Sequence, residues 1–270
     1  MDYEHVKEIA MRAAREAGAL ARTSSGNPGY QQWKGARDLV VGSVFPVQER
    51  IIEIIRSEFP AHAILREESQ EQPPADADPL WIVDPIDGTQ NFSQGIPHFA
   101  ISIAYREEGV YRVGVVYDPN SDEMFHAIQG RYARLNNTPI TVRQIAEGED
   151  AYNQAVIATD LPGGVDERLQ NLRIATILAG QCISLNVMGS PALALCYLAA
   201  GRLHGYFSLA PQLWDVAAAS VILDESGGVL TDIRGGSWLH RTRGYIASNR
   251  VIHGWILRAC IGVMDPHRVG

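Results

Sequence analysis

The sequence predicts an α+β fold, with an α/β fold as the alternative, and three observations lead to this prediction. Residues 4–22 and 46–59 have the apolar spacing of helices. Short apolar runs between residues 80 and 128 then follow, with connections of hairpin length. After about residue 140, helical segments alternate with strand-like ones. The first helices should therefore cover one face of a sheet, and a second unit should follow.

The first two helices are predicted from apolar periodicity and from residues that suit helix ends. Residues 4–22 form an amphipathic pattern that ends at the turn-forming sequence "TSSGNPGY". In the second pattern, "PVQERIIEIIRSEF" at 46–59, Pro46 suits the first helical turn. Helical spacing in this segment is kept by Val47, Ile51, Ile54, Ile55 and Phe59.

An antiparallel meander is predicted for the middle of the chain. The connections "REEG" and "DPNS" are short enough for hairpins, and they join the last three of four apolar runs. These runs are residues 80–83, 98–105, 110–117 and 123–128. A further short strand, "AIL" at 63–65, is expected before them.

The second half of the chain contains elements with recognisable end signals. Residues 155–160 predict a strand, and residues 166–179 predict a helix that Gly180 stops. Ser190 and Pro191 suit the N-cap and the first position of a helix. The remaining predicted elements are a helix from Trp214 to the Gly227–Gly228 pair, a strand at 244–249 and a helix at 250–262.

We expect a domain boundary within "NNTPITVRQIAEGED", near residues 138–150. It divides the chain into an N-terminal α+β domain, residues 1–140, and a C-terminal α/β domain, residues 141–270. The N-terminal domain would carry most of the candidate metal ligands described below, and the C-terminal domain would complete the site.

Composition and charge favour an intracellular protein that does not bind nucleic acid as its main ligand. The 270 residues carry a net charge of −8, with a sequence pI near 5.5, whereas a nucleic-acid surface needs a basic face. The three cysteines, in apolar surroundings without short spacing, suit buried thiols in a reducing compartment. The N-terminus does not read as a signal peptide, and the most apolar stretch, "PALALCYLAA", is too short to span a bilayer. We therefore expect a cytoplasmic protein with no membrane partner.

The stretch "WIVDPIDGTQNF" at 81–92 places Asp84 and Asp87 directly after an apolar strand. One interpretation is a strand end followed by an Asp-Gly turn, which needs no function. The other is a metal site, because buried carboxylates are costly unless a cation pairs with them. With the Ile86 carbonyl they offer three hard oxygens, which suit Mg²⁺. Gly88 allows close backbone approach, and the amides that begin at Thr89 can hold a phosphate.

The other acidic candidates are weaker when each is considered alone. Glu67 and Glu68 follow the expected strand "AIL", where adjacent glutamates are usually solvated. Asp215 in "QLWDVAAAS" has a competing interpretation as a helix N-cap. His98, His126, His204 and His240 show no ligand spacing. The sequence also lacks GxGxxG after a strand, GxxxxGK[ST] and GxSxG, which argues against a Rossmann dehydrogenase, a P-loop kinase and an α/β-hydrolase.

The order of these motifs resembles that of the inositol monophosphatase family of Mg²⁺-dependent, lithium-sensitive phosphatases. The resemblance runs from "KGARDLV" at 34–40 to "IASN" at 246–249, and "WIVDPIDGTQNF" and "WDVAAASVILDESGG" are specific in combination. It implies a layered αβαβα sandwich of the sugar phosphatase type, often a homodimer. The implied activity is hydrolysis of a small phosphate monoester by metal-activated water, with two or three Mg²⁺ ions.

The resemblance also implies roles for individual residues. The matching metal ligands are Glu67, Asp84, the Ile86 carbonyl, Asp87 and Asp215, whereas Glu68 matches a glutamate that is not a principal ligand. Gly88 and Thr89 match backbone phosphate binders, and Asp87 and Asp215 also border the substrate. Glu67 and Thr89 are the implied catalytic residues. Two metal ions can clamp the attacking and leaving oxygens, so no covalent nucleophile is required.

The sequence departs from the family pattern at four positions. Val44, six residues after Asp38, stands where the family has an aspartate that bonds to the threonine and helps to activate water. General-base help is worth ~10²–10⁴-fold, although Glu67 offers another proton acceptor. Ser208 replaces a glutamate that holds sugar hydroxyls in inositol-preferring members. Arg66 replaces a glycine, and we expect it to pair with Glu68 at the surface rather than reach a second phosphate; Gln90 replaces a common threonine.

Two hypotheses of different classes follow from these observations. The first is an active Mg²⁺-dependent phosphatase for a phosphorylated alcohol, sugar or nucleotide, and the retained carboxylates favour it. The second is a catalytically weakened member that binds metal and phosphate and acts as a binding or regulatory protein, which Val44 favours.

Overall fold

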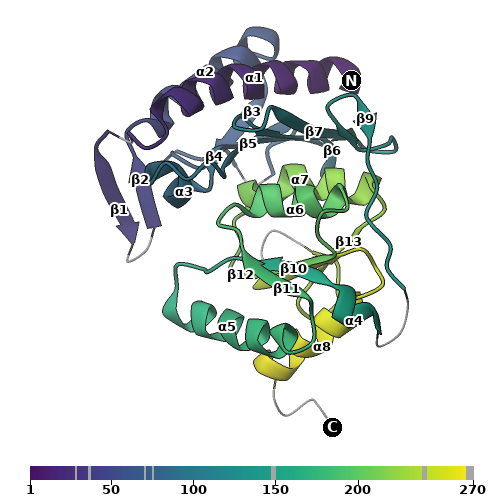
Figure 1. The fold of residues 1–270 in the computed structure, drawn as a ribbon. Coiled ribbons are helices and arrows are strands. Elements are labelled where there is room, and N and C mark those ends of the chain that lie inside the picture. Colours follow the sequence, from purple (N-terminus) through teal and green to yellow (C-terminus); the bar gives the residue numbers. More distant parts are fainter. Residues whose placement is uncertain are drawn as a thin grey trace.

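The computed structural model describes residues 1–27, 29–35, 38–69, 71–74, 76–146, 150–238 and 242–265. These residues form five layers: outer helices, a seven-stranded sheet, inner helices, a five-stranded sheet and a second set of outer helices (Figure 1). The predicted αβαβα sandwich is therefore confirmed. His240 and the "AR" of "KGARDLV" lie outside the described residues.

The first layer consists of α1 (Tyr3–Ser24) and α2 (Val44–Glu58), which cover the outer face of the first sheet (Figure 1). Asp2 caps α1, because its side chain accepts the Glu4 amide at 3.0 Å. A row of small buried residues lets α1 lie close to the sheet. Both helices were predicted, and α2 begins two residues earlier than expected, at Val44 instead of Pro46.

The first sheet has the strand order β3-β4-β5-β6-β7-β8-β9. β3 pairs with β4 in parallel, and all other neighbours are antiparallel, so the predicted meander is confirmed. Its strands are β3 (Ala63–Arg66), β4 (Leu80–Asp87), β5 (Ala100–Glu107), β6 (Val110–Asp118), β7 (Glu123–Ile128), β8 (Arg134–Leu135) and β9 (Thr138–Pro139). β4 runs four residues beyond its predicted end and includes both aspartates of the "DPID" sequence.

The second sheet has the order β11-β10-β12-β14-β13. β11, β10 and β12 are parallel, and β14 pairs antiparallel with both β12 and β13. Its strands are β10 (Val156–Thr159), β11 (Ser184–Val187), β12 (Gly205–Leu209), β13 (Val229–Asp232) and β14 (Gly244–Ser248). On its outer face lie α5 (Val165–Ala179) and α8 (His253–Met264), while α4 (Asp150–Gln154) precedes β10 (Figure 1).

The middle layer, α6 (Pro191–Ala199) and α7 (Leu213–Glu225), lies between the two sheets (Figure 1). One hydrophobic cluster joins all three layers, with residues such as Ile82 of β4, Leu195 of α6 and Tyr245 of β14. α7 approaches β6 so closely that a Cβ on Gly114 would lie 2.1 Å from the Ala218 carbonyl oxygen. The inner helices are thus packed against the first sheet. This packing fixes the position of their N-termini with respect to β4.

Several details differ from the sequence-based expectations. The strands β11, β12 and β13 were not predicted, nor was the hairpin of β1 (Gln31–Gly35) and β2 (Asp38–Val41). Asp215 is the third residue of α7 and not its N-cap, which is Gln212. In the described part of the chain, no helix is both long and apolar enough to cross a membrane. The three cysteines are free thiols; Cys196 and Cys260 are buried and Cys182 is half-buried.

Candidate metal and phosphate site

Parallel pairing of β3 and β4 brings Glu67 beside Asp84. Arg66, the last residue of β3, is aligned with Val83, and the Glu67 amide donates to the Val83 carbonyl at 3.2 Å. Parallel strands end at the same edge of a sheet, so the carboxylates that follow them meet there. Glu67 contributes to raising the pKa of Asp84, both by its charge and by a side-chain hydrogen bond.

A β-bulge places Asp84 and Asp87 on the same face of β4. In a regular strand, residues three apart point to opposite faces. Here Asp84 is aligned with Ser102 and Asp87 with Ala100, so three steps along β4 match two steps along β5. The extra residue in the Pro85–Ile86 segment restores the two carboxylates to one side. The Pro85–Ile86 segment thus sets the relative orientation of the two acids.

Asp215 reaches the same place from the first turn of α7. Its carboxylate accepts the Gln212 amide at 3.1 Å and completes a capping box. The preceding residue is fixed to the first sheet, because the Ser102 hydroxyl donates to the Trp214 carbonyl at 3.2 Å. Since Ser102 is the strand partner of Asp84, this contact holds the start of α7 beside the acidic end of β4.

The three aspartates form one cluster, with one carboxylate oxygen from each lying within 4.8 Å of the others. Asp84 and Asp87 are buried and Asp215 is half-buried. Burial raises the pKa of Asp84 well above its usual value, and the charges of Glu67, Asp87 and Asp215 add to this effect. Such a set is electrostatically costly without a cation, and its hard oxygens suit Mg²⁺.

Asp87 is also tied to the middle layer. Its Oδ2 atom accepts the Ser190 hydroxyl and, at 3.0 Å, the Ala192 amide at the start of α6. Burial raises the pKa of Asp87 to about 8, and these two hydrogen bonds oppose that rise. Ser190 is the N-cap residue of α6, as predicted, but its side chain does not cap the helix. Asp87 supplies the capping oxygen instead.

Gly88 and Thr89 form the turn that follows the acids. Gly88 has φ = +97°, and a Cβ there would lie 3.0 Å from the Gly189 carbonyl oxygen and 3.1 Å from that of His98. Only glycine suits this position, because it tolerates positive φ and leaves no Cβ to clash. Thr89 begins the short helix α3 (Thr89–Ser93), and its hydroxyl donates to the Ile86 carbonyl at 3.0 Å.

The positions that depart from the family pattern have ordinary packing environments. Val44 is buried in the same hydrophobic cluster as Ile86. Ser208 is buried on β12, with its hydroxyl 3.5 Å from the Leu209 carbonyl. Arg66 forms an ion pair with Glu49 of α2 at 3.3 Å, and Glu68, its expected partner, is buried.

Two of the histidines form backbone hydrogen bonds, and one buried acid was not among the sequence candidates. His126 contacts the Asn136 carbonyl, and His204 accepts the Val156 amide through Nδ1. Asp160 follows β10 directly, is 8% exposed, and contributes to raising the pKa of Asp87. Its signal in the sequence was the same as that of Asp84: an acid immediately after an apolar strand.

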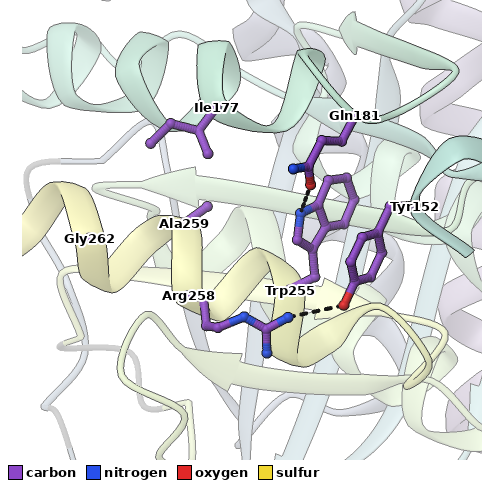
Figure 2. Close-up of a pocket in the computed structure, with 7 residues that line it drawn as sticks. All are labelled: Tyr152, Ile177, Gln181, Trp255, Arg258, Ala259 and Gly262. Carbon is purple, nitrogen blue, oxygen red and sulfur yellow. Dashed lines mark hydrogen bonds between the residues drawn. The ribbon is translucent and has the colours of Figure 1, made fainter. Parts of the chain in front are cut away.

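A separate pocket lies on the outer face of the second sheet, between α5 and α8 (Figure 2). The rings of Tyr152 and Trp255 stack there at 4.6 Å, with 12° between their planes. Gln181 accepts the Trp255 indole N–H at 2.8 Å, and Arg258 donates to the Tyr152 hydroxyl at 3.0 Å. These polar groups satisfy one another, and the pocket lining contains no carboxylate or thiol.

Comparison with known proteins assigns the chain to a family. A model of the inositol monophosphatase family matches residues 2–262. A protein named Nus factor SuhB from Pasteurella multocida is 40% identical over 232 residues, covering 84% of this chain and 85% of that protein. Its Escherichia coli namesake is 36% identical over 247 residues, 89% of this chain and 90% of that protein. The chain belongs to the inositol monophosphatase family.

Solved structures agree with this assignment. An IMPase from Thermotoga maritima has a TM-score of 0.88 at 30% identity, covering 98% of this chain and 99% of that one. The extragenic suppressor protein suhB from Bartonella henselae also has a TM-score of 0.88, at 32% identity, covering 95% of this chain and 98% of that one. Family membership supports a phosphatase-type function and metal binding, and the aspartate cluster fits a divalent cation.

Proposed function

We propose that this protein is a Mg²⁺-dependent phosphatase that hydrolyses a small phosphate monoester, such as an inositol phosphate, a sugar phosphate or a nucleotide phosphate. The observation that carries the proposal is the cluster of Asp84, Asp87 and Asp215. Two of these carboxylates are buried with raised pKa values. A cation is the simplest compensation for acids held this close, and phosphoryl transfer needs the positive charge that it brings.

In this proposal five groups bind two or three Mg²⁺ ions: Glu67, Asp84, the Ile86 carbonyl, Asp87 and Asp215. The Ile86 carbonyl already accepts the Thr89 hydroxyl, but a carbonyl oxygen has two lone pairs and can serve both partners. When bound, Mg²⁺ neutralises phosphate charge and lowers the pKa of water. Lithium sensitivity, which the family resemblance implies, is part of the proposal.

The remaining roles concern the substrate and the proton. The backbone amides of Gly88 and Thr89 are proposed to hold the phosphate, in the turn that glycine makes possible. Asp87 and Asp215 would border the esterified alcohol. Glu67 is proposed as the proton acceptor, because Val44 has no group that can bind a proton. The Thr89 hydroxyl would help to orient the attacking water.

A second candidate function is supported by the names of relatives. The similar curated proteins are called Nus factors, which describes a factor and not an enzyme. Together with Val44, this favours a catalytically weakened protein that acts through binding. The earlier expectation that nucleic acid is not the main ligand stays a prediction, as does the cytoplasmic location.

The first experiment is phosphate release from a panel of esters, measured with Mg²⁺, with EDTA and with added Li⁺. The panel contains inositol 1-phosphate, fructose 1,6-bisphosphate, histidinol phosphate and adenosine 3′,5′-bisphosphate. Release that requires Mg²⁺ and falls with Li⁺ is the expected result. Mg²⁺ binding without release from any ester would favour the binding-protein function.

Val44 allows a sharper test of the two functions. If a missing base limits turnover, Val44→Asp should raise the rate, by at most ~10²–10⁴-fold. Val44→Asn is the matched control, because it adds similar polarity without a carboxylate. We expect the aspartate variant to lose stability, since Val44 is 1% exposed, so the rate is compared at a temperature where both variants are folded. Equal rates in the two variants would show that another group accepts the proton.

We also propose that the protein is a homodimer and that α5 and β11 form the interface. Six large apolar residues are exposed on α5, on β11 or directly before β11: Val165, Leu169, Leu172, Ile177, Ile183 and Val187. β11 is an edge strand of the second sheet, and exposed apolar edges favour association. Light scattering after size exclusion should show a dimer that Ile183→Asp dissociates. Tyr132→Asp, at an exposed position of the N-terminal half, is the control that should leave it intact.

A further inference from the structure

Asp160 is the centre of a buried hydrogen-bond network beside the acidic cluster. Its two carboxylate oxygens face two different donors: Oδ1 accepts the Gly189 amide, and Oδ2 accepts the hydroxyl of fully buried Tyr206. Asp160 is supplied by the end of β10 and Tyr206 by β12, which is parallel to it. A carboxylate suits the position because it has two acceptor oxygens and no donor.

The network holds the turn at residues 188–190 from one side, and Asn91 holds it from the other. The Met188 amide donates to the Thr159 carbonyl at 3.1 Å. The Asn91 side-chain amide donates to the Met188 carbonyl at 3.1 Å and to the His98 carbonyl at 2.9 Å. Gly189 has φ = +75°, and a Cβ on it would lie 2.8 Å from the Asn91 amide nitrogen. The turn therefore has little freedom to move.

This turn ends at Ser190, which contacts Asp87. The Ser190 hydroxyl and the Ala192 amide both donate to the Oδ2 atom of Asp87. A continuous series of contacts thus runs from Tyr206 through Asp160, Gly189 and Ser190 to Asp87. It connects the second sheet to a carboxylate of the first sheet.

We propose that Asp160 is a positioning residue for the metal site. By fixing the 188–190 turn, it holds Ser190 and the start of α6 against one oxygen of Asp87, so that the other oxygen faces the cation. The proposal rests on the proposed metal-dependent function, because it assigns Asp87 to a cation. Groups that orient a metal ligand in this way commonly affect metal affinity by ~10–100-fold when they are removed.

The test compares Mg²⁺ affinity, measured by calorimetric titration, in variants of the whole protein. Asp160→Ala should weaken Mg²⁺ binding by about 10-fold or more. Asp160→Asn should restore most of the affinity, because its carbonyl can accept the Gly189 amide while its NH₂ donates to the Tyr206 oxygen. Tyr206→Phe leaves the hydrogen bond between Asp160 and the Gly189 amide in place, so it should weaken Mg²⁺ binding less than Asp160→Ala. It serves as the second variant if Asp160→Ala fails to fold.

Asp232→Ala is the matched control for the loss of a turn-capping aspartate. The Asp232 Oδ1 atom accepts the Arg234 amide at 2.8 Å and the Gly236 amide at 2.9 Å, at the end of edge strand β13. We expect this variant to lower the melting temperature and to leave Mg²⁺ affinity unchanged.

The outcomes separate this proposal from the proposed function. Unchanged Mg²⁺ affinity in Asp160→Ala, or an equal loss in Asp232→Ala, would overturn the positioning role. If the unmodified protein binds Mg²⁺ but releases no phosphate from any ester, the phosphatase function fails while the expected affinity order still applies. A protein that binds no Mg²⁺ would overturn both.

Discussion

The acidic cluster at the end of β4 and the pocket between α5 and α8 differ in how their polar groups are paired. In the pocket, each named donor has a matching acceptor: the Trp255 indole pairs with Gln181, and Arg258 pairs with Tyr152 (Figure 2). In the cluster, the carboxyl groups lie close to other carboxyl groups. Asp84 is surrounded by Glu67, Asp87 and Asp215, and all three charges raise its pKa.

This difference separates polar groups that pair with one another in the folded chain from like-charged groups whose proximity a cation would compensate. Paired groups such as Trp255 and Gln181 lower the free energy of the folded chain on their own. Like charges held together, here by the bulge in β4, raise it, and the contacts of Asp87 with α6 compensate in part. The acidic cluster, and not the pocket, therefore contains groups that suit a cation.

The largest expected effect is that of Asp84→Asn on activity. Asparagine keeps the acceptor for the Ile86 amide, now 3.0 Å from Asp84 Oδ1, but removes the charge. We expect Mg²⁺-dependent phosphate release to fall by roughly 10²–10³-fold, the usual loss when one charge-stabilising group is removed. In EDTA, the melting temperature should rise, because asparagine replaces a buried acid whose ionised form is costly. Unchanged activity would exclude Asp84 from the site, and Asp215→Asn provides a second, independent loss.

The pH dependence of stability should differ between the metal-free and the Mg²⁺-loaded protein. Burial raises the pKa of Asp87 to about 8 in the fold, from an ordinary value of 3.8, so between these values the folded state binds more protons than the unfolded state. The contribution of Asp87 to stability is therefore greatest below about pH 4 and declines as the pH rises to about 8. In EDTA, the melting temperature should fall by several degrees from pH 6 to pH 8.

Mg²⁺ should reverse this trend, because it binds the deprotonated carboxylate. The stabilisation by saturating Mg²⁺ should accordingly be larger at pH 8 than at pH 6. Asp87→Asn is the control, in which the decline in EDTA should become shallower. A melting temperature in EDTA that is independent of pH, in a protein that still binds Mg²⁺, would contradict the raised pKa of Asp87.

Much of the fold was predictable because its main helices and central strands have strong patterns. α1 and α2 show clear apolar periodicity, and the meander has hairpin-length connections. The missed strands are short or lack an apolar run: β11 reads "SLNV", and β12 begins with Gly205. Their pairing depends on neighbouring strands, which local sequence does not specify. The division into domains at 138–150 stays a prediction.

The acids of the candidate site were selected from the sequence, whereas their geometry was only partly predictable. Glu67, Asp84, Asp87 and Asp215 were selected from strand ends and a helix start, and the structure brings the three aspartates together. The bulge that turns Asp87 toward Asp84 is a property of the pairing between β4 and β5. Asp160 follows an apolar strand as Asp84 does, but no second acid stands within three residues after it, and its partners lie 29 and 46 residues away along the chain.

The smallest expected effect on activity comes from the pocket between α5 and α8. Gln181→Ala removes the acceptor of the Trp255 indole and should lower the free energy of unfolding by about 1 kcal/mol. Tyr152→Phe removes only the hydrogen bond to exposed Arg258 and keeps the ring stacking, so its effect should be smaller still. Neither variant should change phosphate release or Mg²⁺ affinity, because neither residue contacts the acids. Activity is compared at a temperature where Gln181→Ala and Asp84→Asn are both folded. If Gln181→Ala loses as much activity as Asp84→Asn, the pocket and the acidic cluster are functionally coupled. Complete pairing of its polar groups would then not identify the pocket as purely structural.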